Sequence, residues 1–392
     1  MNARVVTAQN VASRLADGGS WPVDVARTPT RWLVAGDPQT TTSRFFSVLE
    51  RHGALEDDGL LRSDVGLVSM GDHFDFLMGH PEAERAGREI LSWLAAQPNA
   101  VVLAGNHDVA RVAELAFETD GSFAEARKLA QGIWEAHEAG ELAKASVLAA
   151  EFHERFPRIP SPSMVIRDFA SFSVAQRTLV ERVLLSGKMR LAAVGRRGRT
   201  PLLLTHAGVT KREMALLGVE GPSEPLAIAG RLASTLSSSV VQVRASWESG
   251  TRRALALEPL HVAGIGGKQG GGLLYHRPAR PDREGADPKW EYDPKAPRRF
   301  DPRSLPLGLA QVVGHSGHAR CVRSLGDWVS EEARAAHVPL RTLRVGSMGV
   351  RYESGARDHV EGEASLVMVD AGFADAPLET IALLEVDEVV VP

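Results

Sequence analysis

Short apolar runs that end in polar side chains recur along this 392-residue chain. Runs of about four to eight residues with β-branched content are typical of strands that are buried on both faces. A glycine at the exit of four of these runs allows the backbone to turn sharply. The five runs are RWLVA before Gly36-Asp37, VGLVSM before Gly71-Asp72, AVVLA before Gly105-Asn106-His107, PLLLT before His206, and AQVV before Gly314-His315.

Helical patterns separate the first strands. Residues 43–53 (SRFFSVLERHG) have apolar positions at helical spacing, and residues 81–97 (PEAERAGREILSWLAAQ) open with proline and two glutamates, as helices often do. Alternating strands and helices predict an α/β fold in which helices cover a parallel or mixed sheet. Because ligands bind at the carboxyl ends of the strands in such folds, we expect the five polar clusters to meet there.

Two spacers interrupt this alternation within what we expect to be a single domain over residues 1–392. Residues 109–185 are rich in Ala, Glu and Leu and predict a helical insertion, which is a candidate cap. Residues 264–307 are rich in Gly and Pro and predict a loop, which is a candidate lid. The segments SLVMVDAGF and TIALLEVDEVVV near the C-terminus predict closing strands.

Composition and charge narrow the class of protein. The chain is 44% hydrophobic and 24% charged, as globular proteins are, and its net charge of −4 provides no electrostatic signal for nucleic acid or an anionic membrane. Its single cysteine, Cys321, excludes an intrachain disulfide and is expected to be a buried small residue. Neither a targeting peptide nor a run approaching about 18 apolar residues is visible. We therefore expect a cytoplasmic protein, and no partner protein can be inferred.

The polar clusters combine carboxylate, amide and imidazole groups. Mixed oxygen and imidazole ligands suit manganese, iron or zinc better than calcium or magnesium alone. Two such ions about 3.5–4 Å apart neutralise a phosphoryl group and stabilise both oxygens of an in-line displacement. The candidate groups belong to Asp37, Asp72, Asp75, Asn106, His107, His206, His315 and His318.

The blocks GDPQT, GDHFD, GNHD, THAG and GHSGH, in this order between Gly36 and His318, resemble the five signature blocks of the calcineurin-like metallophosphoesterases. GNHD together with HAG is similar to the branch that contains phosphoprotein phosphatases and symmetrical diadenosine tetraphosphate hydrolases. The resemblance implies a sandwich of mixed β-sheets flanked by helices, with two divalent metal ions. It also implies hydrolysis of a phosphate ester by direct attack of metal-bound hydroxide. The substrate would be a phosphoprotein, a nucleotide or a phosphorylated small molecule.

The resemblance also implies a role for each matched residue. Asp37 would bind the first metal, and Asp72 would bridge both metals. Asn106, His206 and His315 would bind the second metal, and Asn106 would also contact the substrate.

His107 would be the general acid or a transition-state donor. A carboxylate behind a catalytic histidine fixes its tautomer, and either Asp75 or Asp108 could supply it. His73, inside the block GDHFD, is expected to be a histidine of a surface loop.

Three positions depart from the family pattern. Gln39 stands where the family has a histidine that binds the first metal, and its neutral carbonyl oxygen is a weaker ligand. His318 lies three positions after His315 instead of two, and we hypothesise that it partly replaces the missing ligand. The arginine that grips phosphate after the second block is absent, and Arg277 is the substitute that we expect. An alternative interpretation of these departures is a degenerate fold that serves as a binding or regulatory module.

Overall fold

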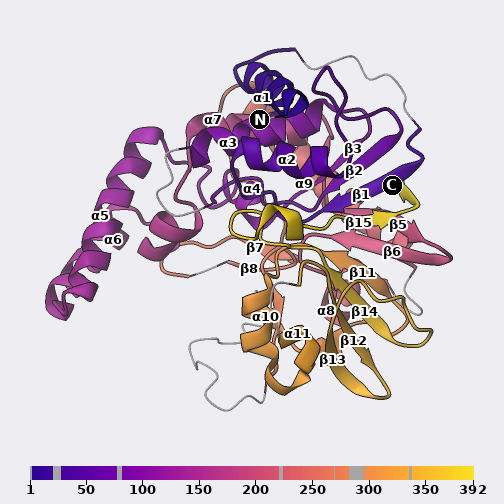
Figure 1. Cartoon of the computed structure of the whole chain (residues 1–392). Helices are drawn as coiled ribbons and strands as arrows, with labels where there is room; N and C mark the ends of the chain where they lie inside the picture. Colours follow the sequence, from indigo (N-terminus) through magenta and orange to yellow (C-terminus); the bar gives the residue numbers. More distant parts are fainter. Residues whose placement is uncertain are drawn as a thin grey trace.

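Two mixed β-sheets pack face to face, and helices cover both outer faces (Figure 1). The computed structural model describes residues 2–20, 28–76, 82–219, 224–268, 270–281, 295, 297–334 and 338–392. The chain is mixed α/β, as the alternation of strands and helices predicted, and its two large sheets form a sandwich.

The first sheet carries three of the five predicted strand ends. Its order is β15–β1–β2–β3–β4, in which β15 is antiparallel to β1 and the other strands are parallel. These strands are β1 (Arg31–Ala35), β2 (Val65–Ser69), β3 (Ala100–Leu103), β4 (Met189–Arg190) and β15 (Leu384–Val386). The helices on its outer face are α1 (Ala3–Ala16), α2 (Thr42–Arg51), α3 (Ala83–Ala96) and α7 (Val174–Leu185).

The second sheet carries the other two predicted strand ends. Its order is β13–β12–β14–β11–β6–β5–β16, and the three central strands β14, β11 and β6 are parallel. Its strands are β5 (Ala192–Arg197), β6 (Thr200–Thr205), β11 (Ala310–Val313), β12 (Arg341–Gly346), β13 (Gly349–Ser354), β14 (Ala364–Met368) and β16 (Glu388–Val390). The helical segments near it are α8 (Lys211–Leu217), α9 (Pro225–Glu248), α10 (His318–Leu325), α11 (Glu331–Arg334) and the 3-10 turn η3 (Gly326–Trp328), whereas the 3-10 turn η4 (Leu378–Thr380) contacts α2.

The core between the sheets follows from the period of two along each strand. Val34 of β1 and Val312 of β11 belong to one buried cluster between the sheets. Their neighbours point the other way, since Leu33 packs under the helices of the first sheet and Val313 packs under α10 and α11. Strands buried on both faces explain why the runs are continuously apolar. Cys321 is 2% exposed and belongs to the core below the second sheet, as predicted.

The predicted insertion over residues 109–185 is helical, but only part of it leaves the sandwich. It follows α4 (Asn106–Ala110) and contains α5 (Asp120–Glu138), α6 (Leu142–Arg155), the π-helix η1 (Met164–Asp168) and α7. Helices α5 and α6 form a hairpin that extends away from the sheets (Figure 1). Helix α7, in contrast, packs against α3 and β4 in the main core. A role of the hairpin as a cap stays a prediction.

The predicted loop over residues 264–307 is more ordered than expected where the structure describes it. Residues 269, 282–294 and 296 lie outside the described part of the chain. Residues 271–276 are buried. The short elements of this loop are β8 (Gly271–Gly272), β9 (Arg277–Pro278), β10 (Arg299–Phe300) and the 3-10 helix η2 (Pro302–Ser304), and β8 pairs with β7 (His261–Val262), which precedes the loop. The buried stretch contacts the candidate site, so it is part of the fold as well as a candidate lid.

Among the described residues, one helix is long and apolar enough to cross a membrane. This corrects the expectation that no segment approaches a membrane span. Helix α9 has 24 residues, and 33% of its most apolar 18-residue stretch is buried. Its buried positions, among them Ile228, Leu232 and Leu236, recur at helical spacing, and the helix packs against β5 and β6. A single helix of this kind is weak evidence for a membrane, and the cytoplasmic location stays a prediction.

Candidate metal centre

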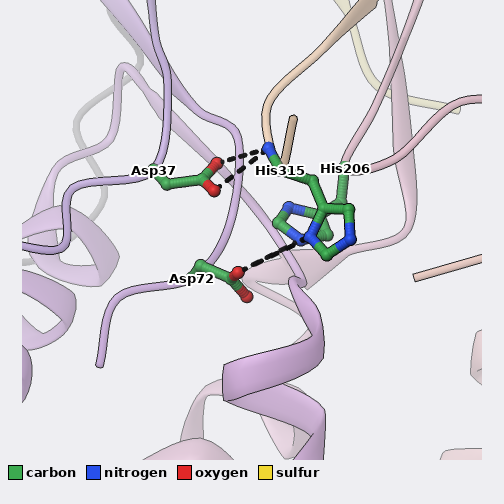
Figure 2. Close-up of side chains that lie close together, drawn as sticks. All are labelled: Asp37, Asp72, His206 and His315. Atoms are coloured by element: carbon green, nitrogen blue, oxygen red, sulfur yellow. Dashed lines mark hydrogen bonds and ion pairs between the residues drawn. The ribbon is translucent and has the colours of Figure 1, made fainter. Parts of the chain in front are cut away.

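Five side chains predicted as metal ligands follow the carboxyl ends of parallel strands. Asp37 follows β1, Asp72 follows β2, and Asn106 begins α4 after β3 in the first sheet. His206 follows β6 and His315 follows β11 in the second sheet. All five are at most 6% exposed. The two sheets therefore bring their strand ends together in the interior, as Figure 2 shows for four of these residues.

Asp37, Asp72, His206 and His315 form one cluster whose candidate ligand atoms all lie within 4.8 Å of one another (Figure 2). His206 Nε2 lies 3.4 Å from Asp72 Oδ2 and 3.1 Å from His315 Nδ1. Asp37 is tied to the same loop because the peptide N–H of His315 donates to both of its carboxylate oxygens, at 2.9 and 3.0 Å. The chain therefore has a buried Asp–His cluster that could hold a metal ion.

The two imidazoles of the cluster turn their second ring nitrogens toward each other. His206 Nδ1 donates to the carbonyl of Met70 at 2.7 Å, and His315 Nε2 donates to that of Tyr275 at 2.9 Å. In a neutral imidazole the other nitrogen then carries a lone pair. Two lone pairs 3.1 Å apart repel each other unless a proton or a cation lies between them. Histidines whose tautomer is fixed by a second hydrogen bond are typical metal ligands.

The amide of Asn106 reaches the same point. One of its two terminal atoms lies 3.3 Å from both His206 Nε2 and Asp72 Oδ2 and 3.0 Å from His315 Nδ1. An amide nitrogen in this place donates to these acceptors, whereas an amide oxygen becomes a ligand for a cation among them. The set of two imidazoles, carboxylates and one amide therefore fits a divalent ion with mixed nitrogen and oxygen ligands.

The electrostatics of the cluster also favour a cation. Burial and the carboxylates of Asp370 and Asp72 hold the pKa of Asp37 well above its usual range. Burial opposes ionisation of Asp72 too, but His206 and His107 hold its pKa well below the usual range. Burial lowers the pKa of His206, yet the charges of Asp72 and Asp37 overcome this effect and raise it to about 9. A cation would replace the proton on His206 and relieve the repulsion between the carboxylates.

The backbone at the site is strained in three places. Asp72, Asp75 and His315 have φ angles of 57°, 66° and 57°, in the left-handed region that residues other than glycine seldom adopt. In the described ranges they are the non-glycine residues with positive φ. Such conformations cost about 1–3 kcal/mol each and concentrate at functional sites. Their coincidence with the predicted site is independent of the sequence blocks.

His107 lies beside the cluster and is held by Asp75, one of its two predicted partners. Its Nδ1 donates to Asp75 Oδ2 at 2.9 Å, and its Nε2 lies 3.9 Å from Asp72 Oδ2. The buried guanidinium of Arg111 lies 2.6 Å from the same Asp75 oxygen. Burial opposes ionisation of Asp75, but Arg111 and His107 lower its pKa. Burial also opposes a charge on His107, yet Asp72 and Asp75 raise its pKa, which suits a proton donor.

Asp108, the other predicted partner of His107, is engaged elsewhere. Its carboxylate accepts hydrogen bonds from the peptide N–H groups of Asp72 and Gly105, at 2.9 and 2.8 Å. It also accepts from the peptide N–H and from Nδ1 of His73, at 3.1 and 2.9 Å. The expectation that Asp108 orients His107 is therefore corrected. Asp108 instead joins the loops that carry the second and third blocks.

His73 is buried, so the expectation of a surface loop histidine was wrong. It is 1% exposed, and its ring lies between the carboxylate of Asp108 and the hydroxyl of Ser69, which is 2.9 Å from His73 Nε2. Both ring nitrogens are thus satisfied inside the protein, which explains why a polar side chain is stable there.

Two predicted ligands make other contacts. The amide nitrogen of Gln39 donates to the carbonyl of Phe74 at 2.7 Å. His318 begins α10, stacks on the ring of Tyr352 and contacts its hydroxyl at 3.0 Å from Nδ1. The four-residue cluster does not include His318, so its placement gives no support to the hypothesis that it replaces the missing histidine.

Arg277, the predicted phosphate-binding residue, contacts the cluster directly. Its Nε donates to the carbonyl of His315 at 3.2 Å, and its Nη2 lies 3.3 Å from His315 Nδ1. Burial and the neighbouring charges of Arg320 and Arg298 lower the pKa of Arg277 to about 9, so it is still charged at neutral pH. A buried guanidinium that repels its neighbours is ready to pair with an anion.

Sequence reasoning missed two charged residues at the site, Asp370 and Arg111. The backbone of Asp370 lies against Gly36, where an added Cβ would be 2.8 Å from Asp370 Cα. The sequence contained a signal for Asp370, because SLVMVDAGF is an apolar run that ends in a carboxylate, as the runs before Asp37 and Asp72 do. Arg111 had no such signal, since it stands among the small and apolar residues that follow GNHD.

A scan against protein-family models, a search of curated proteins and a search of solved structures found no match for this chain. Its function must therefore be argued from the residues of the site.

Proposed function

We propose that this protein is a phosphohydrolase of the metallophosphoesterase type that uses two divalent ions of manganese, iron or zinc. One observation carries the proposal: His206 Nε2 and His315 Nδ1 face each other at 3.1 Å beside Asp72, where a cation between them would relieve the repulsion. The five sequence blocks and a sandwich with its strand ends in one place support the same type of enzyme.

The cluster has enough groups for two ions. Asp72, Asn106, His206 and His315 would hold one cation, and Asp37 with Asp72 would hold the other. When bound, such cations neutralise a phosphoryl group and lower the pKa of a bound water. The set that contains His206 and His315 is the more complete, because the set of Asp37 and Asp72 lacks a histidine.

The remaining residues would act on the substrate. His107 is held through Nδ1 by Asp75, so its Nε2 is free to protonate the leaving oxygen of a phosphate ester. Arg277 lies against His315 and can pair with a phosphate oxygen. The products would be inorganic phosphate and the alcohol or phosphate of the leaving group.

Hydrolysis of p-nitrophenyl phosphate with manganese tests this proposal. We expect turnover by the wild type, loss of turnover in Asp72→Ala, and wild-type turnover in Asp358→Ala, whose side chain is 91% exposed. Circular dichroism of the three proteins shows whether a loss reflects unfolding. A panel of a phosphopeptide, nucleotides, a dinucleoside polyphosphate and a small phosphomonoester then identifies the substrate class.

The alternative is a degenerate fold used for binding or regulation. It is supported by the weak ligand set of the metal that Asp37 would bind. Gln39 replaces a histidine there, and its amide nitrogen is engaged by Phe74. Folded wild-type protein that neither turns over a substrate nor retains a metal would support this alternative and contradict the proposed enzyme.

A further inference from the structure

The end of the helical insertion touches the back of the His107–Asp75 pair. Ser171 lies between η1 and α7, and its peptide N–H and its hydroxyl both donate to Asp75 Oδ1, at 2.9 and 2.6 Å. Asp75 Oδ2 accepts from His107 Nδ1 and lies 2.6 Å from Arg111 Nη2. One carboxylate therefore interacts with four donors, two of which come from a residue 96 positions away.

Phe169, in the same segment, covers one side of the imidazole. Its ring centroid lies 5.4 Å from that of His107, at an interplanar angle of 77°. The guanidinium of Arg111 lies 5.8 Å from the Phe169 ring and 4.7 Å from the ring of Phe74. The ring of His107 is thus held by a hydrogen bond at one end and by an aromatic edge at its side.

The position of this segment depends on the helical hairpin. Phe169 belongs to a buried cluster that is separate from the core of the sandwich, and other members of this cluster are Phe123 and Ala130 of α5, Phe152 of α6, and Met164 and Val165 of η1. A π-helix immediately before the segment is a rare element that is frequent at functional sites. Phe169 is therefore packed on the hairpin, and Ser171 lies two residues further along the same segment.

We propose that Ser171 and Phe169 are positioning residues for His107, so that the insertion controls proton donation to the leaving group. This inference rests on the proposed function. Without the hydroxyl of Ser171, Asp75 Oδ1 keeps one donor and the carboxylate is freer to rotate away from His107. A misaligned histidine slows the reaction only where the leaving oxygen must be protonated, because a good leaving group departs as an anion.

The test compares two substrates in three variants. In Ser171→Ala we expect kcat for a phenylethyl phosphate, which has a poor leaving group, to fall about tenfold or more. The kcat for p-nitrophenyl phosphate should stay within about twofold, because a nitrophenolate needs no proton. Ser171→Thr retains the hydroxyl and should restore the ratio. Ser163→Ala is the matched control, since that hydroxyl pairs with Ser161 at 3.0 Å in the same part of the insertion.

A second measurement does not depend on turnover. In protein labelled with nitrogen-15 histidine, the Nδ1–H signal of His107 is assigned by its loss in His107→Gln. We expect Ser171→Ala to broaden this signal through faster exchange with water, and Ser171→Thr to retain it.

The two measurements separate failure of the inference from failure of the proposed function. If Ser171→Ala keeps both the wild-type substrate ratio and the wild-type signal, the positioning role is wrong while the phosphohydrolase stands. If the wild type hydrolyses neither substrate, the proposed function fails, and the signal alone decides: loss in Ser171→Ala with retention in Ser171→Thr supports positioning, and an unchanged signal overturns it.

Discussion

Replacing Gly105 by alanine should remove metal binding and leave the fold in place. Gly105 precedes α4 with a φ of −101°, which alanine adopts without strain. An added Cβ would lie 2.1 Å from Asp72 Oδ1 and 2.4 Å from Asp72 N, whereas ordinary contacts begin at 3.4 Å. The carboxylate of Asp72 would therefore have to move by the difference between 3.4 and 2.1 Å, or about 1.3 Å, and its peptide nitrogen by the difference between 3.4 and 2.4 Å, or about 1.0 Å.

Such displacements are large for a metal ligand, and for the fold they are confined to the loops that follow β2 and β3. Ligand distances in metal sites vary by only about 0.2 Å, so a shift several times larger removes Asp72 from the set. Changes that merely loosen a ligand already cost about 10–100-fold in metal affinity, so we expect at least about 100-fold weaker binding of manganese. The cost of the extra methyl group to the fold should be about 1–3 kcal/mol.

Calorimetric titration with manganese and unfolding in urea measure the two effects separately. Gly132→Ala is the matched control, because an added Cβ on that helical glycine would meet only Leu148 Cδ1, at an ordinary 3.8 Å. It should raise the free energy of unfolding by about 0.5–1 kcal/mol and leave manganese binding unchanged. Wild-type manganese affinity in folded Gly105→Ala would refute the assignment of Asp72 as a ligand in this cluster.

Two further predictions concern charge in the site. Asp75→Asn should lower the free energy of unfolding in urea by about 3–5 kcal/mol, because it leaves Arg111, whose side chain is 0% exposed, without its counter-charge. Glu125→Gln, which removes an exposed partner of Arg155, is its control and should change little, and equal effects of the two would contradict this reasoning. Since the pKa of His206 is raised to about 9, metal binding near neutral pH must displace its proton. The apparent affinity should then rise about tenfold per pH unit up to pH 9, and chelator-treated protein should lose the stability due to this proton between about pH 6.5 and 9. Titration calorimetry in buffers of different ionisation enthalpy measures the released proton, and a pH-independent affinity would contradict the assignment.

The candidate ligands could be located from the sequence because the signals for them are local. Asp37, Asp72, Asn106, His206 and His315 each come at the end of an apolar run, and the run itself defines where its strand ends. Alternation with helices then implies parallel strands, whose carboxyl ends share an edge. Neither step needs any contact between distant segments, so both predictions agree with the structure.

The groups that support His107 could not be predicted, because they depend on such contacts. Ser171 reaches Asp75 from 96 positions away, and it stands in a segment whose composition indicates only helices and turns. The choice between Asp75 and Asp108 also lay beyond the sequence, since both are close to the blocks. It was decided by α4, whose first turn directs the carboxylate of Asp108 back to the peptide N–H of Gly105.

The glycines before four of the ligands serve a different purpose from the predicted sharp turn. They are Gly36, Gly71, Gly105 and Gly314, and of these only Gly71 has a positive φ, of 98°. A Cβ on Gly36 would lie 2.2 Å from the carbonyl oxygen of Val369 beyond β14, and a Cβ on Gly314 would lie 2.2 Å from Asp37 Oδ1. Glycine is required at Gly36 because the backbones of the two sheets approach each other there, and at Gly314 because the Asp37 carboxylate occupies the space of a side chain. Since the carboxylates come from one sheet and the imidazoles from the other, a side chain at these positions would separate the two halves of the cluster.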